Sequence, residues 1–525
     1  MYQQVQPTAT IANDMPNLKK EEPRRWFTLE FLCHYLMIGQ ALYFGFQSVL
    51  RISSPSHPNY PKYSSFLSDG WIPGRSIDLS DRQYGGFRRS ILPLSAVMLL
   101  YLLVSFMLKQ KRTLFSTTVA IRAVIGLVFM FLLHGFNLTK ILFIVGVNYC
   151  LTRVVPSKIR PVSVWAWALI VLFGTEWIDF PFIPKSLFLG FYTRWNIVFK
   201  VTVLRMISYS MDHHCFLETK MSSSQEKGQE HDALDSSDFE WLEYLAFLFY
   251  PPLYLAGPIM TFQAFISQLK NPNVQLKATV VYGLRMLSCF LFLDILLHYC
   301  HVQAIKESRM FVNFTPLDFG MVGFFNLKII WLKLLIIWRF FRLIALFDGI
   351  NPPENMMRCM TNNYSGMAFW RSWHRSFYLW IVKYLYVPLG GSKHMIYNIW
   401  PVFMFVAVWH DLSLHLLAWS WLICLFFIPE FVAKWACTKW NLQEHKYYRQ
   451  MCGAAAAGSI CMMMIANLVG FAIGLDGMKT LVKSVLTTKG GFIFSISALL
   501  TMYSAAQVMF EVRAEELRNG IKNNF

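Results

Sequence analysis

Two histidines lie in apolar, aromatic surroundings where an ionisable ring could do chemistry. His374 lies in the segment FWRSWHRS at 369–376, and His410 ends the segment FVAVWH at 405–410. They are close enough in the sequence for a turn to bring two successive hydrophobic segments together. A neutral imidazole accepts a proton well near neutral pH, and ionisable residues within membrane segments are typical of functional sites. The pair therefore predicts a general base with a second, assisting group.

A structural interpretation of both histidines stays open. His410 can be a buried side chain packed beside Trp409, with its ring nitrogens bonded to helix carbonyls or to Asp411. If residues 369–381 form one continuous helix, residues three and four apart share a face. His374 then belongs to an apolar stripe that faces protein, and the arginines form a polar stripe that faces water or phosphate. The apolar stripe is Trp370, His374, Phe377 and Ile381; the polar one is Arg371, Arg375 and Tyr378.

A basic set surrounds His374: Arg371, Arg375, Lys383 and Lys393. Its charge pattern is typical of a loop at the bilayer interface. The alternative is a surface that binds a phosphorylated cofactor or a lipid head group. Asp294 and His298, one helical turn apart in another apolar run, are expected to form a structural pair instead.

Composition indicates a multi-pass membrane protein. Hydrophobic residues make up 55% of the chain, aromatic residues 17% and charged residues only 15%, and the mean hydropathy is +0.39. A soluble domain would carry more charge. The net charge of +18 comes from short basic loops beside apolar runs, as the positive-inside rule expects, so we predict no nucleic-acid partner. The ten cysteines show no paired spacing that would suggest a disulfide framework or a zinc site.

The apolar runs predict an all-α bundle. Many have the length that a helix needs to cross a bilayer, and the shorter ones suggest re-entrant helices around a cavity. We expect about ten to twelve transmembrane and re-entrant helices. The candidate runs are 31–50, 91–108, 118–133, 141–155, 162–173, 241–260, 280–300, 320–337, 399–409, 414–431, 452–475 and 492–510.

The polar stretches divide this membrane region. We expect a polar amino-terminal tail at 1–26, membrane helices at 27–217, a polar linker at 218–238, core helices at 239–510 and a short charged tail at 511–525. The stretch 51–90, rich in Pro and Ser, is expected to be a luminal loop, with the amino terminus in the cytosol.

The segment 369–393, followed by Trp409 and His410, resembles the membrane-bound O-acyltransferase (MBOAT) family. Its hallmark is an intramembrane histidine, here His410, preceded some tens of residues earlier by Asn, Asp or His, here His374. Segments 204–212 and 250–262 support the resemblance. A fungal glycerol-uptake subgroup that remodels glycosylphosphatidylinositol (GPI) anchors is similar over nearly the whole chain, at 57–60, 80–84, 331–334, 346–350 and 353–356.

The resemblance implies an acyltransferase bundle around a central tunnel, in the endoplasmic reticulum membrane or alternatively the plasma membrane. The donor would be acyl-CoA, with its phosphates near the basic set and with Trp370 and Trp409 lining the substrate site. His410 would act as the base and His374 would orient the acceptor, a lyso-GPI anchor or another lipid-linked hydroxyl. Two alternatives remain: a polyol (glycerol) transporter, which would need inverted repeats or broken-helix pairs, and a non-catalytic membrane scaffold.

Cys359 precedes His374 in the segment NMMRC at 355–359. In the related hedgehog acyltransferase branch a cysteine in this neighbourhood ligates haem, and a thiolate is a reasonable axial ligand. The resemblance therefore implies a structural haem at Cys359. The alternative is a free cysteine that packs as a small hydrophobe. No catalytic metal is expected.

Overall fold

The computed structural model describes residues 23–110, 113–175, 190–192, 194–223, 234–309, 311, 313–411 and 413–521. Most of the predicted amino-terminal tail and the middle of the predicted linker lie outside these residues. The described residues form helices joined by turns and loops, with one short antiparallel two-stranded sheet, β1 with β2, which confirms the predicted all-α class. The elements before the long central helix are α1 (Leu29–Ile52), α2 (Tyr60–Tyr63), β1 (Ser68–Asp69), β2 (Ser76–Ile77), α3 (Arg82–Gln110), α4 (Phe115–His134), α5 (Asn137–Val154), α6 (Arg160–Gly174), α7 (Trp195–Ser223), α8 (Trp241–Leu248), α9 (Pro251–Tyr254), α10 (Phe262–Lys270), α11 (Leu276–Tyr299) and α12 (Val302–Ser308).

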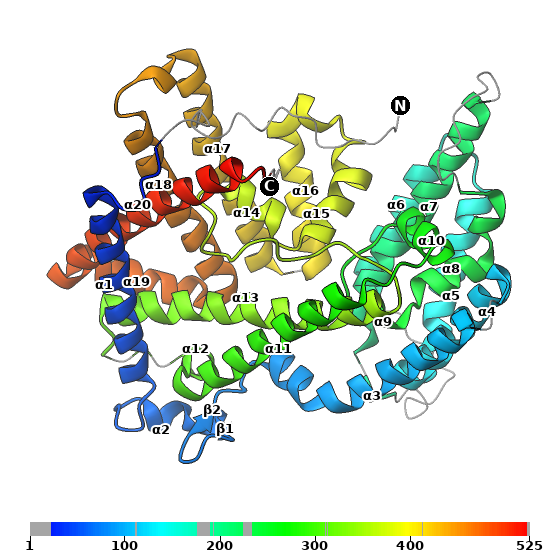
Figure 1. The fold of residues 1–525 in the computed structure, drawn as a ribbon, viewed down its shortest axis with the longest axis horizontal. Coiled ribbons are helices and arrows are strands. Elements are labelled where there is room, and N and C mark those ends of the chain that lie inside the picture. Colours follow the sequence, from blue (N-terminus) through cyan, green and yellow to red (C-terminus); the bar gives the residue numbers. More distant parts are fainter. Residues whose placement is uncertain are drawn as a thin grey trace.

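The longest helix, α13 (Pro316–Phe347), crosses the middle of the molecule with α11 packed along it (Figure 1). Helices α3 to α8 and α10 gather on one side, and α1 packs with the carboxy-terminal helices on the other. The elements after α13 are α14 (Gly366–Ser372), α15 (Arg375–Ile381), the π-helical η5 (Val382–Tyr386), η6 (Gly391–His394), α16 (Met395–His410), α17 (Leu414–Lys439), α18 (Tyr448–Asn467), the π-helical η8 (Leu468–Ala472), α19 (Gly474–Thr487) and α20 (Lys489–Arg518).

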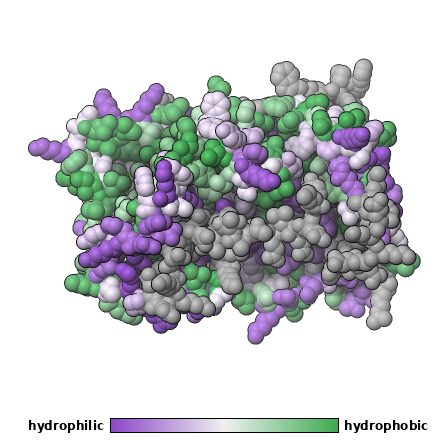
Figure 2. Space-filling model, turned by 90° about the horizontal axis from the view of Figure 1, so that it is seen from above, coloured by the Kyte–Doolittle hydropathy of each residue, from purple (hydrophilic) through white to green (hydrophobic). Residues whose placement is uncertain are grey.

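Six helices among the described residues are long and apolar enough to cross a membrane: α3, α4, α11, α17, α18 with η8, and α20. Large apolar side chains on them face outward, such as Leu92 and Leu100 on α3 and Leu284 on α11. Figure 2 shows wide apolar areas on one face of the molecule, with hydrophilic residues between them. Because exposed apolar surface on this scale marks contact with lipid or protein, the chain is a multi-pass membrane protein.

The predicted loop at 51–90 folds against α11 and α12. The Oδ2 atom of Asp78 accepts hydrogen bonds from the backbone N–H groups of Gln303 and Ala304 in α12, each at 2.9 Å. Asp294 of α11 pairs with Arg88 at 2.6 Å. His298 bonds the backbone carbonyl of Asp294 at 2.7 Å. The carboxylate of Asp294 thus binds Arg88, and the His298 ring bonds the backbone of Asp294 rather than its carboxylate.

A buried carboxylate joins the amino-terminal helices to the central helix. Asp348, which ends α13 and has a fully buried side chain, binds Arg122 of α4 through two hydrogen bonds of 2.7 and 3.0 Å. Tyr101 of α3 donates to it at 2.9 Å and Tyr250, just before α9, at 2.7 Å. Bidentate, charge-assisted bonds of this kind fix orientation as well as distance. The Asp348 cluster therefore sets α3 and α4 against the part of the chain that leads to His374.

Candidate functional site

The helix that carries His374 is broken at that residue. Helix α14 ends at Ser372, Trp373 has extended dihedral angles, and His374 has the left-handed φ of 48°. A left-handed conformation costs a residue with a side chain about 1–2 kcal/mol, and such strain concentrates at functional sites. The prediction of one continuous helix over 369–381 is therefore wrong. The expected apolar and polar stripes do not form, because their members belong to two helices.

The loop before α14 satisfies the backbone groups that the break leaves free. Asn355 accepts from the backbone N–H of Arg375 with its own carbonyl and from that of Ser376 with its side chain, both at 3.1 Å. The N–H of Met357 donates to the carbonyl of Ser372 at 3.3 Å, and Met356 forms an isolated antiparallel bridge with Trp373. A broken helix inside a membrane protein needs such partners, since lipid offers none. The segment 355–357 thus stabilises the turn between α14 and α15.

Aromatic rings enclose the His374 imidazole. It stacks on Trp338 of α13, with 4.4 Å between ring centroids and an interplanar angle of 20°. The Phe377 ring is 5.2 Å away and the Trp409 ring 6.1 Å away. Stacked and offset rings at these separations restrict the orientation of the imidazole. The central helix therefore orients His374 through Trp338.

His410 ends α16, where α7 holds the helix terminus at two points. The indole N–H of Trp409 donates to the carbonyl of Lys200 at 3.0 Å. The Lys200 ammonium in turn donates to the carbonyl of His410 at 2.9 Å. A cation is favourable at a helix carboxy terminus, where carbonyls lack helical partners. These two bonds fix the position of the end of α16, from which the His410 side chain extends.

The structure brings the two predicted histidines to the same indole. The ring of His410 lies 4.8 Å from that of Trp409, and the ring of His374 lies 6.1 Å from it. His410 is an exposed residue. An accessible imidazole in such surroundings can accept a proton from a bound hydroxyl.

Three sequence segments far apart in the chain meet beside this pair. Trp380 of α15 donates to the carbonyl of Leu204 in α7 at 2.9 Å. The Ser376 hydroxyl accepts from the N–H of Ile259 at 2.8 Å, and Ser208 accepts from the N–H of Phe262 at 2.9 Å. Segments 204–212 and 250–262 therefore brace α15 directly after His374.

The predicted basic set is distributed over several elements. Arg371 is in the last turn of α14 and Arg375 begins α15, so the break separates them. Lys383 of η5 forms an ion pair with Asp212 of α7 at 2.7 Å, with 38% of its side chain exposed. Lys393 is exposed in η6, before α16. Trp370 of α14 packs edge-on against Trp419 of α17, with centroids 5.4 Å apart, and so lies between α14 and α17.

The contacts of Cys359 give no support for a haem at this residue. Its sulfur lies 3.7 Å from the Lys328 ammonium and 3.4 Å from the Thr361 hydroxyl. Burial alone would raise the pKa of the Cys359 thiol, but Lys328 and the Thr361 bonds hold that pKa below its ordinary value. The sulfur therefore already has two polar partners in this structure. Among the described residues no group of three or more His, Cys, Asp or Glu side chains could hold a metal ion.

Sequence reasoning missed three residues of the site. Asn355 lies in a segment quoted for the family resemblance, so that segment was the available signal. Trp338 and Lys200 lie on long helices distant in sequence from both histidines, and periodicity alone does not distinguish them from other helix residues. Only the packing of α7 and α13 against the site identifies them.

Comparison with known proteins shows the family of the chain. Residues 90–474 match MBOAT, the membrane-bound O-acyltransferase family. The chain is 38% identical to membrane-bound O-acyltransferase GUP1 of Saccharomyces cerevisiae, covering 96% of both chains, and 37% identical to gup1 of Schizosaccharomyces pombe, covering 94% of this chain and 90% of the relative. A more distant relative is the mouse protein-cysteine N-palmitoyltransferase HHAT, 26% identical over 47% of this chain and 52% of HHAT. These matches show that the chain is an acyltransferase that belongs to the membrane-bound O-acyltransferase family.

Proposed function

We propose that this chain transfers a long acyl group from acyl-CoA to a lipid-linked hydroxyl, with His410 as the general base. The observation that carries the proposal is the geometry of His410. His410 is exposed, the Trp409 indole contacts the rings of both His410 and His374, and the Lys200 ammonium donates to the His410 backbone carbonyl at 2.9 Å. General-base catalysis needs this combination of access and fixed position.

The chemical step is a direct transfer. The acceptor hydroxyl gives its proton to the imidazole of His410 while its oxygen attacks the thioester carbonyl. The bond between that carbonyl carbon and sulfur then breaks, and the leaving thiolate takes the proton from the imidazolium. An ester and free CoA are formed, His410 returns to its neutral form, and no covalent enzyme intermediate is required. His374 orients the acceptor or stabilises the charge that develops on the carbonyl oxygen.

The donor proposal concerns the basic residues around the break. Phosphate groups bind well to guanidinium groups, which offer paired donors. Arg371 and Arg375 lie on either side of His374, and Lys393 is exposed before α16. Lys383 already binds Asp212, so its contribution to a phosphate site would be shared with that carboxylate. The acyl chain would occupy an apolar tunnel lined in part by Trp370 and Trp409.

The acceptor proposal is a lyso-GPI anchor in the endoplasmic reticulum membrane, as the sequence resemblance implies. It is supported by the similarity to the GUP1 proteins along nearly the whole chain. The match to HHAT, named as a protein-cysteine N-palmitoyltransferase, covers about half of the chain. The relatives that match nearly the whole chain are named O-acyltransferases, which supports a hydroxyl acceptor over the amino group of a protein cysteine.

Reconstitution tests this proposal against the transporter and scaffold alternatives. Purified protein in liposomes is given a radiolabelled long-chain acyl-CoA and a lyso-GPI lipid, and glycerol flux is measured in the same preparation. We expect a labelled acyl ester and free CoA in equal amounts, without glycerol flux above that of empty liposomes. Glycerol flux without ester formation would indicate a transporter. The absence of both from a folded preparation would indicate a scaffold.

A further inference from the structure

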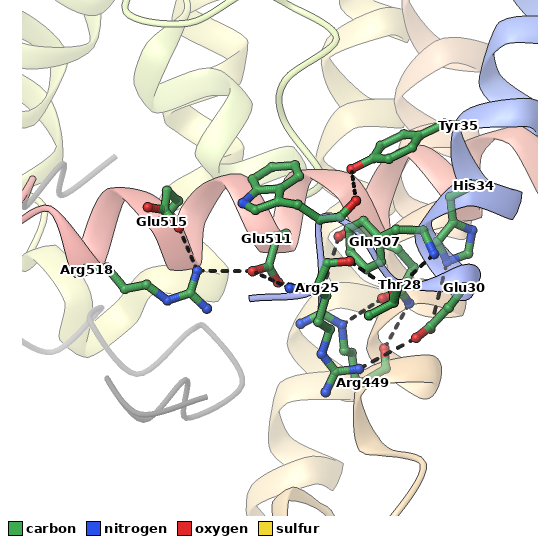
Figure 3. A network of polar contacts seen from close by, with 12 residues as sticks. Arg25, Thr28, Glu30, His34, Tyr35, Arg449, Gln507, Glu511, Glu515 and Arg518 are labelled. Atoms are coloured by element: carbon green, nitrogen blue, oxygen red, sulfur yellow. Dashed lines mark hydrogen bonds and ion pairs between the residues drawn. The ribbon is translucent and has the colours of Figure 1, made fainter. Parts of the chain in front are cut away.

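Glutamates in the last two turns of α20 bind residues of the amino terminus, of α18 and of the loop before α14. Glu511, whose side chain is only 1% exposed, pairs with Arg449 of α18 at 3.6 Å and accepts from the backbone N–H of Arg25 at 3.3 Å. Glu515 pairs with Arg24 at 3.0 Å. Figure 3 shows Glu511 of α20 between Arg518 and Arg25, and Glu515 turned toward Arg518. Residues 511–518 therefore continue a packed helix, where the sequence alone suggests a separate tail.

The third carboxylate, Glu516, reaches the loop before His374. The two guanidinium nitrogens Nη1 and Nη2 of Arg358 donate to its Oε1 and Oε2 at 2.6 and 2.8 Å, across 158 residues of sequence. The side chains are 8% and 21% exposed. A second residue of α20, Arg513, donates to the carbonyl of Asn362 at 2.6 Å. The carboxy-terminal helix thus holds this loop at both ends of the segment 358–362.

The loop that α20 contacts is the same loop that stabilises the helix break at His374. Arg358 follows directly on the segment 355–357, whose bonds to Ser372, Arg375 and Ser376 define the turn at His374. Because Arg358 is bonded directly to Met357, a displacement of Arg358 would also displace the backbone that forms these bonds. A bidentate pair restricts both the distance and the orientation of this peptide.

We propose that Glu516 and Arg358 are positioning residues for His374, so that the carboxy-terminal helix keeps the site in its reactive arrangement. This inference rests on the proposed function, in which His374 and His410 serve the transfer. Neither residue touches the reacting atoms; they act through the segment 355–357. Misplacement of a reacting group by about 1 Å can lower a rate about 100-fold, so a modest shift of the loop is sufficient.

The experiment compares Glu516→Gln, Arg358→Gln and the double variant with Glu515→Gln as the matched control. Glu515 precedes Glu516 and binds Arg24 and Arg518, not the loop. Two quantities are measured on full-length protein in detergent: kcat and KM for acyl transfer, and amide hydrogen exchange of residues 355–376. Each single variant should lower kcat about 10-fold or more with a smaller change in KM, and should speed exchange at Met357, Arg375 and Ser376.

The double variant should cost no more than the more severe single variant, because the two charges act as one pair. Glu515→Gln should retain wild-type turnover and exchange. Unchanged exchange and unchanged kcat in Glu516→Gln, with active wild-type protein, would overturn the inference and leave the proposed function intact. Faster exchange at 355–376 in Glu516→Gln together with an inactive wild type would mean that the proposed function fails while the structural coupling holds.

Discussion

At the scale of single residues, His410 is the proposed general base, so His410→Ala should abolish most activity without unfolding the protein. One imidazole contributes little to an apolar bundle, but loss of a general base typically lowers a rate about 100-fold to 10,000-fold. Turnover is measured on protein that retains the wild-type elution profile. His415→Ala is the matched control, because His415 is exposed at the start of α17. Near-normal turnover by well-folded His410→Ala protein would refute the assignment.

The two arginines beside the break should affect substrate binding instead. Arg371→Ala and Arg375→Ala remove proposed phosphate contacts, which form equally in the bound substrate and the transition state, so KM for acyl-CoA should rise about 10-fold while kcat changes less. Steady-state kinetics with acyl-CoA of varied concentration measures this. Lys446, exposed before α18, offers a control in Lys446→Ala. A collapse of kcat at constant KM would assign the arginines to structure or catalysis.

At the scale of elements, the break between α14 and α15 depends on Asn355. Its side chain accepts from the N–H of Ser376 at 3.1 Å, and Asn355→Ala would leave that buried donor without this partner, at a cost of about 1–3 kcal/mol. We expect lower kcat and a lower unfolding temperature in detergent. Asn355→Asp, which keeps an acceptor oxygen at this position, should retain more activity than Asn355→Ala. Equal activity of the two variants would contradict a role for this hydrogen bond.

At the scale of the whole molecule, the Asp348 cluster couples the amino-terminal helices to the central helix. Arg122→Ala leaves the buried carboxylate without its bidentate partner, and breaking a buried pair in this way typically costs about 3–5 kcal/mol. Thermal unfolding in detergent should show a large loss of stability. Lys306→Ala is the control, because the Lys306 and Glu307 pair, at 3.8 Å, is partly exposed and such pairs contribute at most about 1 kcal/mol. Similar losses of thermal stability in both variants would show that the Asp348 cluster is not a major contributor to stability.

Local composition determined the class of this protein and its candidate residues. Long apolar runs require helices in lipid, because only internal hydrogen bonds can satisfy the backbone there, and polar or ionisable side chains stand out against that background. His374, His410 and Trp409 were therefore identifiable from residue type and neighbourhood. The segments at 204–212, 250–262 and 353–356 were identifiable from family resemblance, and the structure assembles all three around the histidines.

Tertiary contacts decided what periodicity could not. A helical pattern continues through 369–381 in the sequence, but the pairing of 355–357 with the backbone near His374 breaks that helix. The approach of Trp338 to His374, of Lys200 to the end of α16 and of Glu516 to Arg358 joins residues far apart in the chain. Such contacts depend on how helices pack, and helix packing is set by the whole surface of each element rather than by the local order of residue types.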